Sequence, residues 1–131
     1  MNRLFLSVAM AAGLYGAAYA EDGTKCAAGS PDIVKVDYWS PFLAGVMVDY
    51  INATGREIQM IHAKAIVTDA LGAVVAEAEL PPDEALGVKA MSYVIILVDP
   101  KRKISSDNIG NFKAVVCTTS VLYKGGETQS F

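Results

Sequence analysis

FLAGVMVDYINATG, residues 42–55, is the stretch of sequence that decides the fold class. Its apolar residues recur at every second position: Phe42, Ala44, Val46, Val48 and Tyr50. Because alternate side chains lie on the same face of a β-strand, the run predicts a strand with one apolar face and Asp49 on the other. The run ends in Asn-Ala-Thr-Gly at 52–55, which predicts a hairpin loop with Gly55 at positive φ.

The same alternation continues on both sides of this stretch. It predicts further strands over residues 33–38, 56–68, 73–80, 88–98 and 112–124, the first of them stopping near Ser40-Pro41. Residues 69–72, Asp-Ala-Leu-Gly, predict a second hairpin, in which the Asp69 side chain accepts from the turn backbone and Gly72 is left-handed. Pro81 and Pro82 have no amide hydrogen for a ladder, so they end a strand and mark a change of sheet.

Two of these segments predict burial in more detail. Residues 88–98, VKAMSYVIILV, are apolar on both faces near their end, which predicts a central strand covered on both sides. The last strand places four residues on one face: Val115, Cys117, Val121 and Tyr123. Six strands without a helical segment predict an all-β, antiparallel β-sandwich of the immunoglobulin or fibronectin type III-like kind, with about six to seven strands. A small barrel is the alternative.

The N-terminus reads MNRLFLSVAMAAGLYGAAYA over residues 1–20 and predicts a signal peptide. One positive charge, Arg3, precedes an apolar run over 4–18, and Ala18-Tyr19-Ala20 forms a cleavage site before the acidic Glu21. The run is shorter than the roughly 20 residues of a membrane span. We therefore expect a single domain over 21–131 that is periplasmic or secreted and has no membrane span after signal removal.

The charge of the chain argues against one class of partner. Loss of Arg3 with the signal changes the formal net charge from −3 to −4, and the acidic residues are spread along the chain. This balance indicates no nucleic-acid partner. In a eukaryotic host, Asn52-Ala53-Thr54 would be a glycosylation acceptor.

Two cysteines remain after signal removal, Cys26 and Cys117. In an oxidising compartment an even pair usually forms a disulfide, so we expect these two to be bonded. There is no Cys-x-x-Cys pair, and one histidine far from the cysteines makes a poor zinc site.

The order of strands and turns resembles that of small exported bacterial domains of the FxLYD type. The resemblance covers about residues 45–98 and rests on Asn52, Gly55, Asp69 and Gly72, followed by the proline-bearing loop. It implies an immunoglobulin-like sandwich with an extracytoplasmic structural or interaction role, and it carries no catalytic residue. The aromatic residues that give the family its name are replaced here by Ala65, Val67 and Thr68.

The motifs of common enzymes are missing. The sequence has no nucleophile elbow, dinucleotide fingerprint, phosphate loop or zinc-protease motif, and its one histidine is His62. Glu77 and Glu79 share the spacing of an acid and base pair on one strand face, but such a pair is more often a solvated face. We therefore expect no enzyme activity and no cofactor.

A periplasmic copper-binding protein is the alternative function. Met60 and His62 are two residues apart in QMIHAK, residues 59–64, so they share one strand face, and thioether and imidazole suit Cu(I). Met47 or Met91 would have to complete the set. Against this function, Lys64 shares the face and would repel a cation; the same face also holds Ile58 and Ile66. The opposite face makes the better core: Ile61, Ala63, Ala65 and Val67.

Recognition by a surface is the function that the sequence favours. Trp39 and Phe42 stand in an aromatic junction, Tyr-Trp-Ser-Pro-Phe at 38–42, and residues 99–111 form a polar loop with a cationic cluster, Lys101, Arg102 and Lys103. Together they form a candidate interaction surface at one end of the sandwich, where loops often carry function. We expect a non-enzymatic exported binding or accessory domain, with a protein as its possible partner.

The mature protein is expected to begin at Glu21, because Ala18-Tyr19-Ala20 is the one such site near the end of the apolar run. Measurement of the intact mass of exported protein checks this prediction. A mass that still includes residues 1–20 would contradict it.

Overall fold

The computed structural model describes residues 26–131, and the predicted signal peptide and its cleavage site lie outside the described residues. The elements are strands β1 (Val34–Phe42), β2 (Gly45–Asn52), β3 (Ile58–Asp69), β4 (Val74–Glu79), β5 (Met91–Leu97), β6 (Phe112–Tyr123) and β7 (Thr128–Ser130), with a short 3-10 helix η1 (Ile109–Asn111) before β6. Within residues 26–131, no helix has the length and apolar character needed to cross a membrane.

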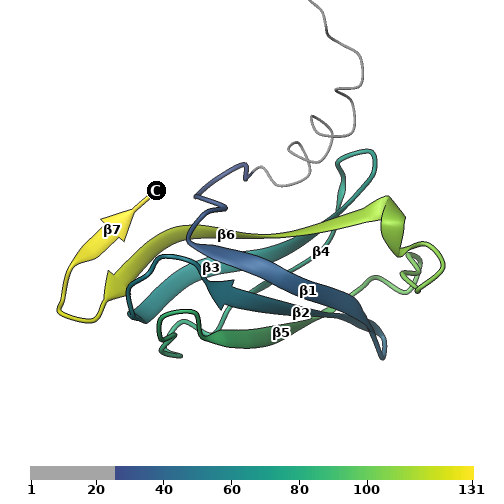
Figure 1. The fold of residues 1–131 in the computed structure, drawn as a ribbon. Coiled ribbons are helices and arrows are strands. Elements are labelled where there is room, and N and C mark those ends of the chain that lie inside the picture. The colour runs from purple at the N-terminus through teal and green to yellow at the C-terminus, as the bar shows by residue number, and fades with distance from the viewer. Residues whose placement is uncertain (1–25) are drawn as a thin grey trace, which may run out of the picture.

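The strands form two antiparallel sheets that pack face to face, as Figure 1 shows. One sheet has the order β1-β2-β5 and the other has the order β4-β3-β6-β7. The predicted fold class, an antiparallel β-sandwich, is confirmed. Because β4 pairs with β3, the order differs from that of constant-type immunoglobulin domains, in which the fourth strand joins the first, second and fifth.

The core lies between the two sheets and is supplied by alternate residues of the strands. Its fully buried apolar side chains include Val34, Val46, Val48, Tyr50, Ile61, Ala65, Val67, Ile96 and Val116. The predicted core face of β3, with Ile61 and Val67 at its ends, is confirmed. Met60, His62 and Lys64 lie on the opposite, exposed face, as predicted.

Bulges in β3 and β6 change the predicted faces of these strands. Ile58 pairs with Tyr123 and Met60 with Leu122, so Gln59 is an extra residue and Ile58 turns into the core. The prediction that Ile58 shares the outer face of Met60 is therefore wrong.

In β6, a bulge at Thr119 separates two groups of residues that were predicted on one face. Val121 and Tyr123 face the core beyond the bulge, whereas before it the core is reached by Val116. Cys117 lines the outer surface of the sheet instead. A bulge shifts the alternation by one residue, so the four predicted positions do not share a face.

A bulge in β1 decides the directions of its two central aromatic side chains. Val36 pairs with Tyr50 and Tyr38 with Asp49, so Asp37 is the extra residue. Beyond it, Trp39 lies opposite the buried Val48 and packs against the core. Tyr38 turns outward and is 61% exposed.

Three expectations about strand connections are wrong. β1 continues through Ser40-Pro41 to Phe42, and the next strand begins only at Gly45. The loop at 53–57 is not a hairpin, because β2 and β3 belong to different sheets. β5 is not a central strand covered on both sides; it is an edge strand that pairs only with β2. The predicted change of sheet after β4 is confirmed.

The turn residues act as predicted. Gly55 and Gly72 have φ values of 79° and 89°, and Asp69 Oδ1 accepts hydrogen bonds from the amides of Leu71 and Ala73, both at 2.9 Å. Gly55 and Gly72 supply the positive φ that the two turns need, and the Asp69 side chain fixes the backbone of the second turn. Membership of the FxLYD family stays a prediction.

Asn52 joins three segments of the chain through one buried side chain, which is 1% exposed. Its Nδ2 donates to the carbonyls of Arg56 (2.7 Å), Leu86 (3.1 Å) and Gly87 (3.1 Å). Its Oδ1 accepts from the amide and hydroxyl of Thr54, at 2.9 and 2.7 Å. The predicted glycan acceptor is thus a fully bonded core side chain, and a glycan there would displace the bonds that order the turn.

The disulfide between Cys26 and Cys117 is confirmed, with their Cα atoms 5.7 Å apart. It ties the arm before β1 to β6. The amide of Ser30 donates to the carbonyl of Thr118 at 2.8 Å, and the amide of Thr118 donates back to Ser30 at 2.9 Å. Gly29 is required beside this bridge, because its φ is 90° and a Cβ would run into the Thr118 carbonyl.

Replacing Cys26 or Cys117 with serine is expected to lower the melting temperature by several degrees or more. The bond spans 91 positions, and the loop-entropy model gives a stabilisation of about 4 to 5 kcal/mol for such a loop, less any strain. Thermal unfolding with and without reductant measures the effect, and equal melting temperatures would contradict it.

Candidate functional site

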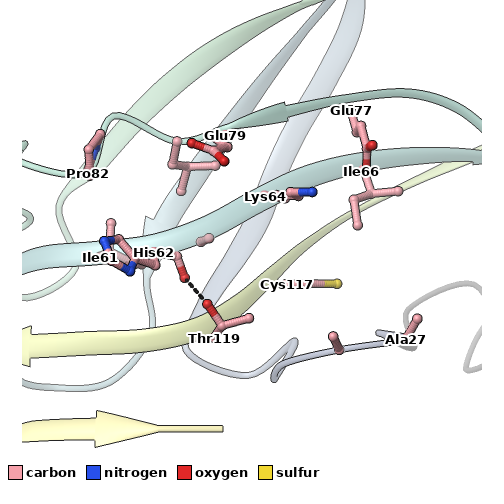
Figure 2. A pocket seen from close by; sticks show the side chains of 13 residues that line it. Ala27, Ile61, His62, Lys64, Ile66, Glu77, Glu79, Pro82, Cys117 and Thr119 are labelled. Atoms are coloured by element: carbon pink, nitrogen blue, oxygen red, sulfur yellow. Dashed lines mark hydrogen bonds between the residues drawn. The ribbon is translucent and has the colours of Figure 1, made fainter.

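A groove of about 470 Å³ with mixed polar and apolar lining lies on the outer face of the four-stranded sheet (Figure 2). Its polar wall is formed by His62 and Lys64 of β3 and by Glu77 and Glu79 of β4. The disulfide-bound arm closes one side with Ala27 and Ala28. The two glutamates with predicted acid and base spacing therefore share one groove with the one histidine.

The contacts of the histidine in this groove lack one member of a Ser-His-Asp triad. His62 Nδ1 lies 3.3 Å from the hydroxyl of Ser120, and the hydroxyl of Thr119 donates to the His62 carbonyl at 3.1 Å. Within residues 26–131, no carboxylate bonds to the imidazole, so the group that orients the base in a Ser-His-Asp triad is missing there. Glu79 lies directly opposite Lys64, as a solvated cross-strand pair of opposite charge.

The residues proposed for copper binding are divided between two sheets. Met60 and His62 share the exposed face of β3. Met47 belongs to β2 and Met91 to β5, and both strands are in the other sheet. Stacked sheets are about 10 Å apart, so these sulfur atoms do not converge on His62. Within residues 26–131, no group of three or more His, Cys, Asp or Glu side chains is placed to hold a metal.

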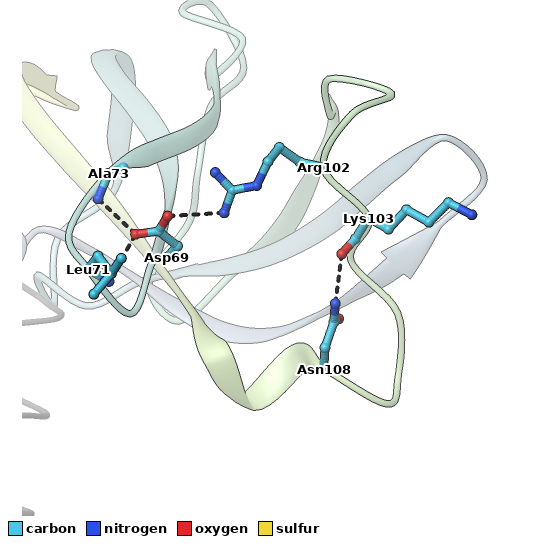
Figure 3. A network of polar contacts seen from close by, with 6 residues as sticks. All are labelled: Asp69, Leu71, Ala73, Arg102, Lys103 and Asn108. Carbon is cyan, nitrogen blue, oxygen red and sulfur yellow. Dashed lines mark hydrogen bonds and ion pairs between the residues drawn. The ribbon is translucent and has the colours of Figure 1, made fainter.

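The cationic cluster lies in an ordered loop at one end of the sandwich (Figure 3). Arg102 Nη2 contacts Asp69 Oδ2 at 3.0 Å, and its guanidinium lies 6.0 Å from the ring centroid of Phe112. The side-chain amide of Asn108 donates to the Lys103 carbonyl at 2.7 Å. All three cationic side chains are exposed, and among the described contacts Arg102 is the one that forms an ion pair.

Asp69 is stabilised in its charged form at this end. Backbone hydrogen bonds, first from Ala73, and the contact with Arg102 lower the pKa of its carboxyl below the usual value. Because the folded-state pKa is the lower one, the ionised group stabilises the fold above the unfolded-state pKa. That contribution is lost as the pH falls through the folded-state pKa.

The candidate interaction surface of the sequence is only partly assembled. Trp39 packs against the core, so it does not contribute an exposed ring. Phe42, at the end of β1, is 38% exposed. The turn that follows Phe42 lines a groove of about 340 Å³ together with residues 98–105, which include Lys103. Phe42 and the lysines thus lie near the same end of the molecule.

A second exposed surface covers the outer side of the three-stranded sheet, and the sequence did not predict it. We call it the apolar face; it is formed by Tyr38, Phe42, Leu43, Met91, Tyr93, Ile95 and Leu97, all exposed. Four of these residues are the alternate side chains of β5, MSYVIIL, which contains no charged residue. The sequence signal for this surface is the apolar run at residues 88–98, which predicts a buried central strand.

Strand register explains why the apolar face is open. Leu97 lies opposite Gly45, where a Cβ would run into the backbone of Ile96. With no side chain possible beside it, Leu97 is 76% exposed. Asp49 lies at the middle of the face, directly between Tyr38 of β1 and Tyr93 of β5. The face is therefore apolar and aromatic, with a central carboxylate and with Lys35 at one end, opposite Ile51.

Comparisons with known proteins give no family: no family model, no curated protein and no solved structure matches the chain.

Titration of the metal-free protein with Cu(I) in the presence of a competing chelator is expected to show no stoichiometric sub-micromolar site. Met60 and His62 share their face with Lys64, whose charge repels a cation, and Met47 and Met91 lie in the other sheet. Tight binding that is abolished by His62→Ala, but retained by a matched Ser120→Ala variant, would contradict this prediction and favour a copper-binding protein.

Proposed function

We propose that the protein is a non-enzymatic exported binding domain that holds a protein partner on its apolar face. The observation that carries this proposal is the exposure of several large apolar side chains side by side on one sheet. Single exposed hydrophobic residues are normal, but a contiguous patch with a polar rim is typical of an interaction site. The aromatic residues Tyr38 and Tyr93 are of the type enriched in protein interfaces.

Leu43, at the tip of the turn between β1 and β2, supports the use of this surface. It has φ 53°, a left-handed conformation that costs a non-glycine residue about 1 to 2 kcal/mol. Its side chain is 91% exposed and makes no core contact that would offset this cost. Backbone strain of this kind clusters at functional sites. An exposed leucine at such a position is well suited to insert into a partner.

The charges near the apolar face define the chemistry of the partner. Asp49 has no ion pair among the described contacts and is flanked by two tyrosines, a setting that suits a lysine or arginine side chain. Lys101 and Lys103 lie beyond the end of β5 and suit acidic residues at the rim. We therefore expect a partner with an apolar centre, a basic residue facing Asp49 and acidic residues near the lysines.

The disulfide bears on the compartment in which the protein works. A disulfide fits an oxidising compartment, and with the predicted signal peptide it supports a periplasmic or secreted protein. The resemblance to FxLYD-type domains agrees with an extracytoplasmic interaction role.

The copper-binding alternative has less support, because its methionines are divided between the two sheets.

The proposal is tested by immobilising the mature protein and identifying the proteins retained from the extracytoplasmic extract of its source. Tyr38→Lys and Leu43→Gly are expected to reduce retention of the specific partner about tenfold or more, because exposed anchors of an interface contribute most of its affinity. Leu43→Gly is also expected to raise the melting temperature by a few degrees, since glycine relieves the strained φ.

The matched control is Lys64→Ala, on the outer face of the other sheet. It is expected to leave retention unchanged. The proposal is contradicted if the same proteins are retained equally by the wild type and both face variants, or if only the Lys64 variant loses them.

A further inference from the structure

Within residues 26–131, the outer edge of β5 presents a row of backbone groups without a hydrogen-bond partner. The Val98 amide donates to the Ala44 carbonyl at 3.3 Å, and the Asn52 amide donates to the Ala90 carbonyl at 3.1 Å. These two bonds mark hydrogen-bonded pairs at both ends of the β2–β5 ladder. In an antiparallel ladder every second pair of opposed residues is hydrogen-bonded. The bonded residues of β5 are therefore Ser92, Val94 and Ile96.

The intervening residues point their amides and carbonyls away from β2. They are Met91, Tyr93, Ile95 and Leu97, the same residues whose side chains form the β5 part of the apolar face. Within residues 26–131, no other strand pairs with β5. Its free edge is thus both a hydrogen-bonding and an apolar surface.

The other edge strands carry features that prevent further pairing, whereas β5 carries none. β1 has Pro41, two charged side chains and a bulge. β4 has two glutamates and an irregular register, and β7 has only three residues. Charges, proline, bulges and short length are the usual means of blocking an edge. β5 has seven residues without a charge, a proline or a bulge.

We propose that β5 pairs antiparallel with β5 of a second copy of this chain, about a two-fold axis through Val94. This register pairs all seven residues. It places Tyr93 opposite Ile95 of the second copy, so that both use the amides and carbonyls that β2 leaves free. Met91 then lies opposite the second copy's Leu97 on the same outer face. Aromatic and β-branched cross-strand pairs are among the favourable ones.

The charges at the two ends of β5 are complementary in this arrangement. Before β5 the chain carries Asp83 and Glu84, and the Glu84 carboxylate accepts from the Ser92 hydroxyl at 3.0 Å. After β5 it carries the exposed Lys101 and Lys103. The charges nearest the strand are Lys89 before it and Asp99 after it. Antiparallel pairing places Lys89 of one copy near Asp99 of the other and the more distant acidic pair toward the lysines, whereas a parallel arrangement would align like charges.

The paired sheet would have the order β1-β2-β5-β5-β2-β1, with both apolar faces on one side of it. The dimer is inferred from the edge of β5, and it does not depend on the identity of any other partner. A partner held on the apolar face would meet a surface built from two copies.

The mass of the protein in solution tests this inference, measured by sedimentation equilibrium on residues 21–131 from low to high micromolar concentration. The wild type is expected to reach twice the monomer mass. The variant with Tyr93→Lys and Ile95→Lys is expected to stay monomeric with an unchanged circular dichroism spectrum, because both side chains are exposed and the substitutions place like charges opposite each other.

A second set of variants tests the antiparallel register. Glu84→Lys is expected to weaken the dimer at least several-fold, and adding Lys101→Glu and Lys103→Glu is expected to restore it. Asp37→Lys, an exposed charge reversal on the opposite edge strand β1, is the control that leaves the mass unchanged. A wild type that stays monomeric at every concentration overturns the inference, as does a dimer that the β5 lysines do not dissociate.

Discussion

The buried amide of Asn52 is the interaction on which the arrangement of the two sheets depends. It lies at the end of β2 and bonds the turn that leads into β3 as well as the segment at 86–87 that leads toward β5. Each of these carbonyls also accepts from a second donor, so removing the Asn52 amide would cost about 0.5 to 1.5 kcal/mol for each hydrogen bond that is lost. Because the same residue pairs its own amide with Ala90, it also sets where β5 begins beside β2. Asn52 therefore helps to place β5, and with it the β5 part of the apolar face, through its side chain and its backbone amide.

Local patterns predicted much of the fold because they depend on neighbouring residues only. Alternation located most of the strands and the core face of β3, and the turn residues Gly55 and Gly72 adopt the expected conformation. Bulges were not predictable, since an extra residue such as Asp37 or Thr119 is defined by the partner strand. The turn chemistry of the loop after Asn52 predicts a hairpin, but the sequence of the loop does not specify which sheet the next strand joins.

The candidate surface was predicted less well, for a related physical reason. A strand that is apolar on both faces suggests burial on both sides, but burial of the outer face needs a second layer packed on it, and no strand of residues 26–131 supplies one over β5. β5 lies at an edge beside the side chain-free Gly45, so its outer residues stay exposed. Trp39 was proposed for the surface and lies inward because of the bulge before it. All three side chains of the cationic cluster are exposed, and Arg102 forms an ion pair with Asp69.

Residue-resolved amide hydrogen exchange, measured on the wild-type protein at low and at high concentration, is the most direct test of an open β5 edge that a second copy pairs with. At low concentration, the amides of Tyr93 and Ile95 should exchange quickly, while those of Val94 and Ile96, which bond to β2, should be protected. At high concentration, all four should be protected. Protection of Tyr93 and Ile95 at low concentration would show that the edge is already covered within one chain, and fast exchange of both at every concentration would show that no second copy pairs there.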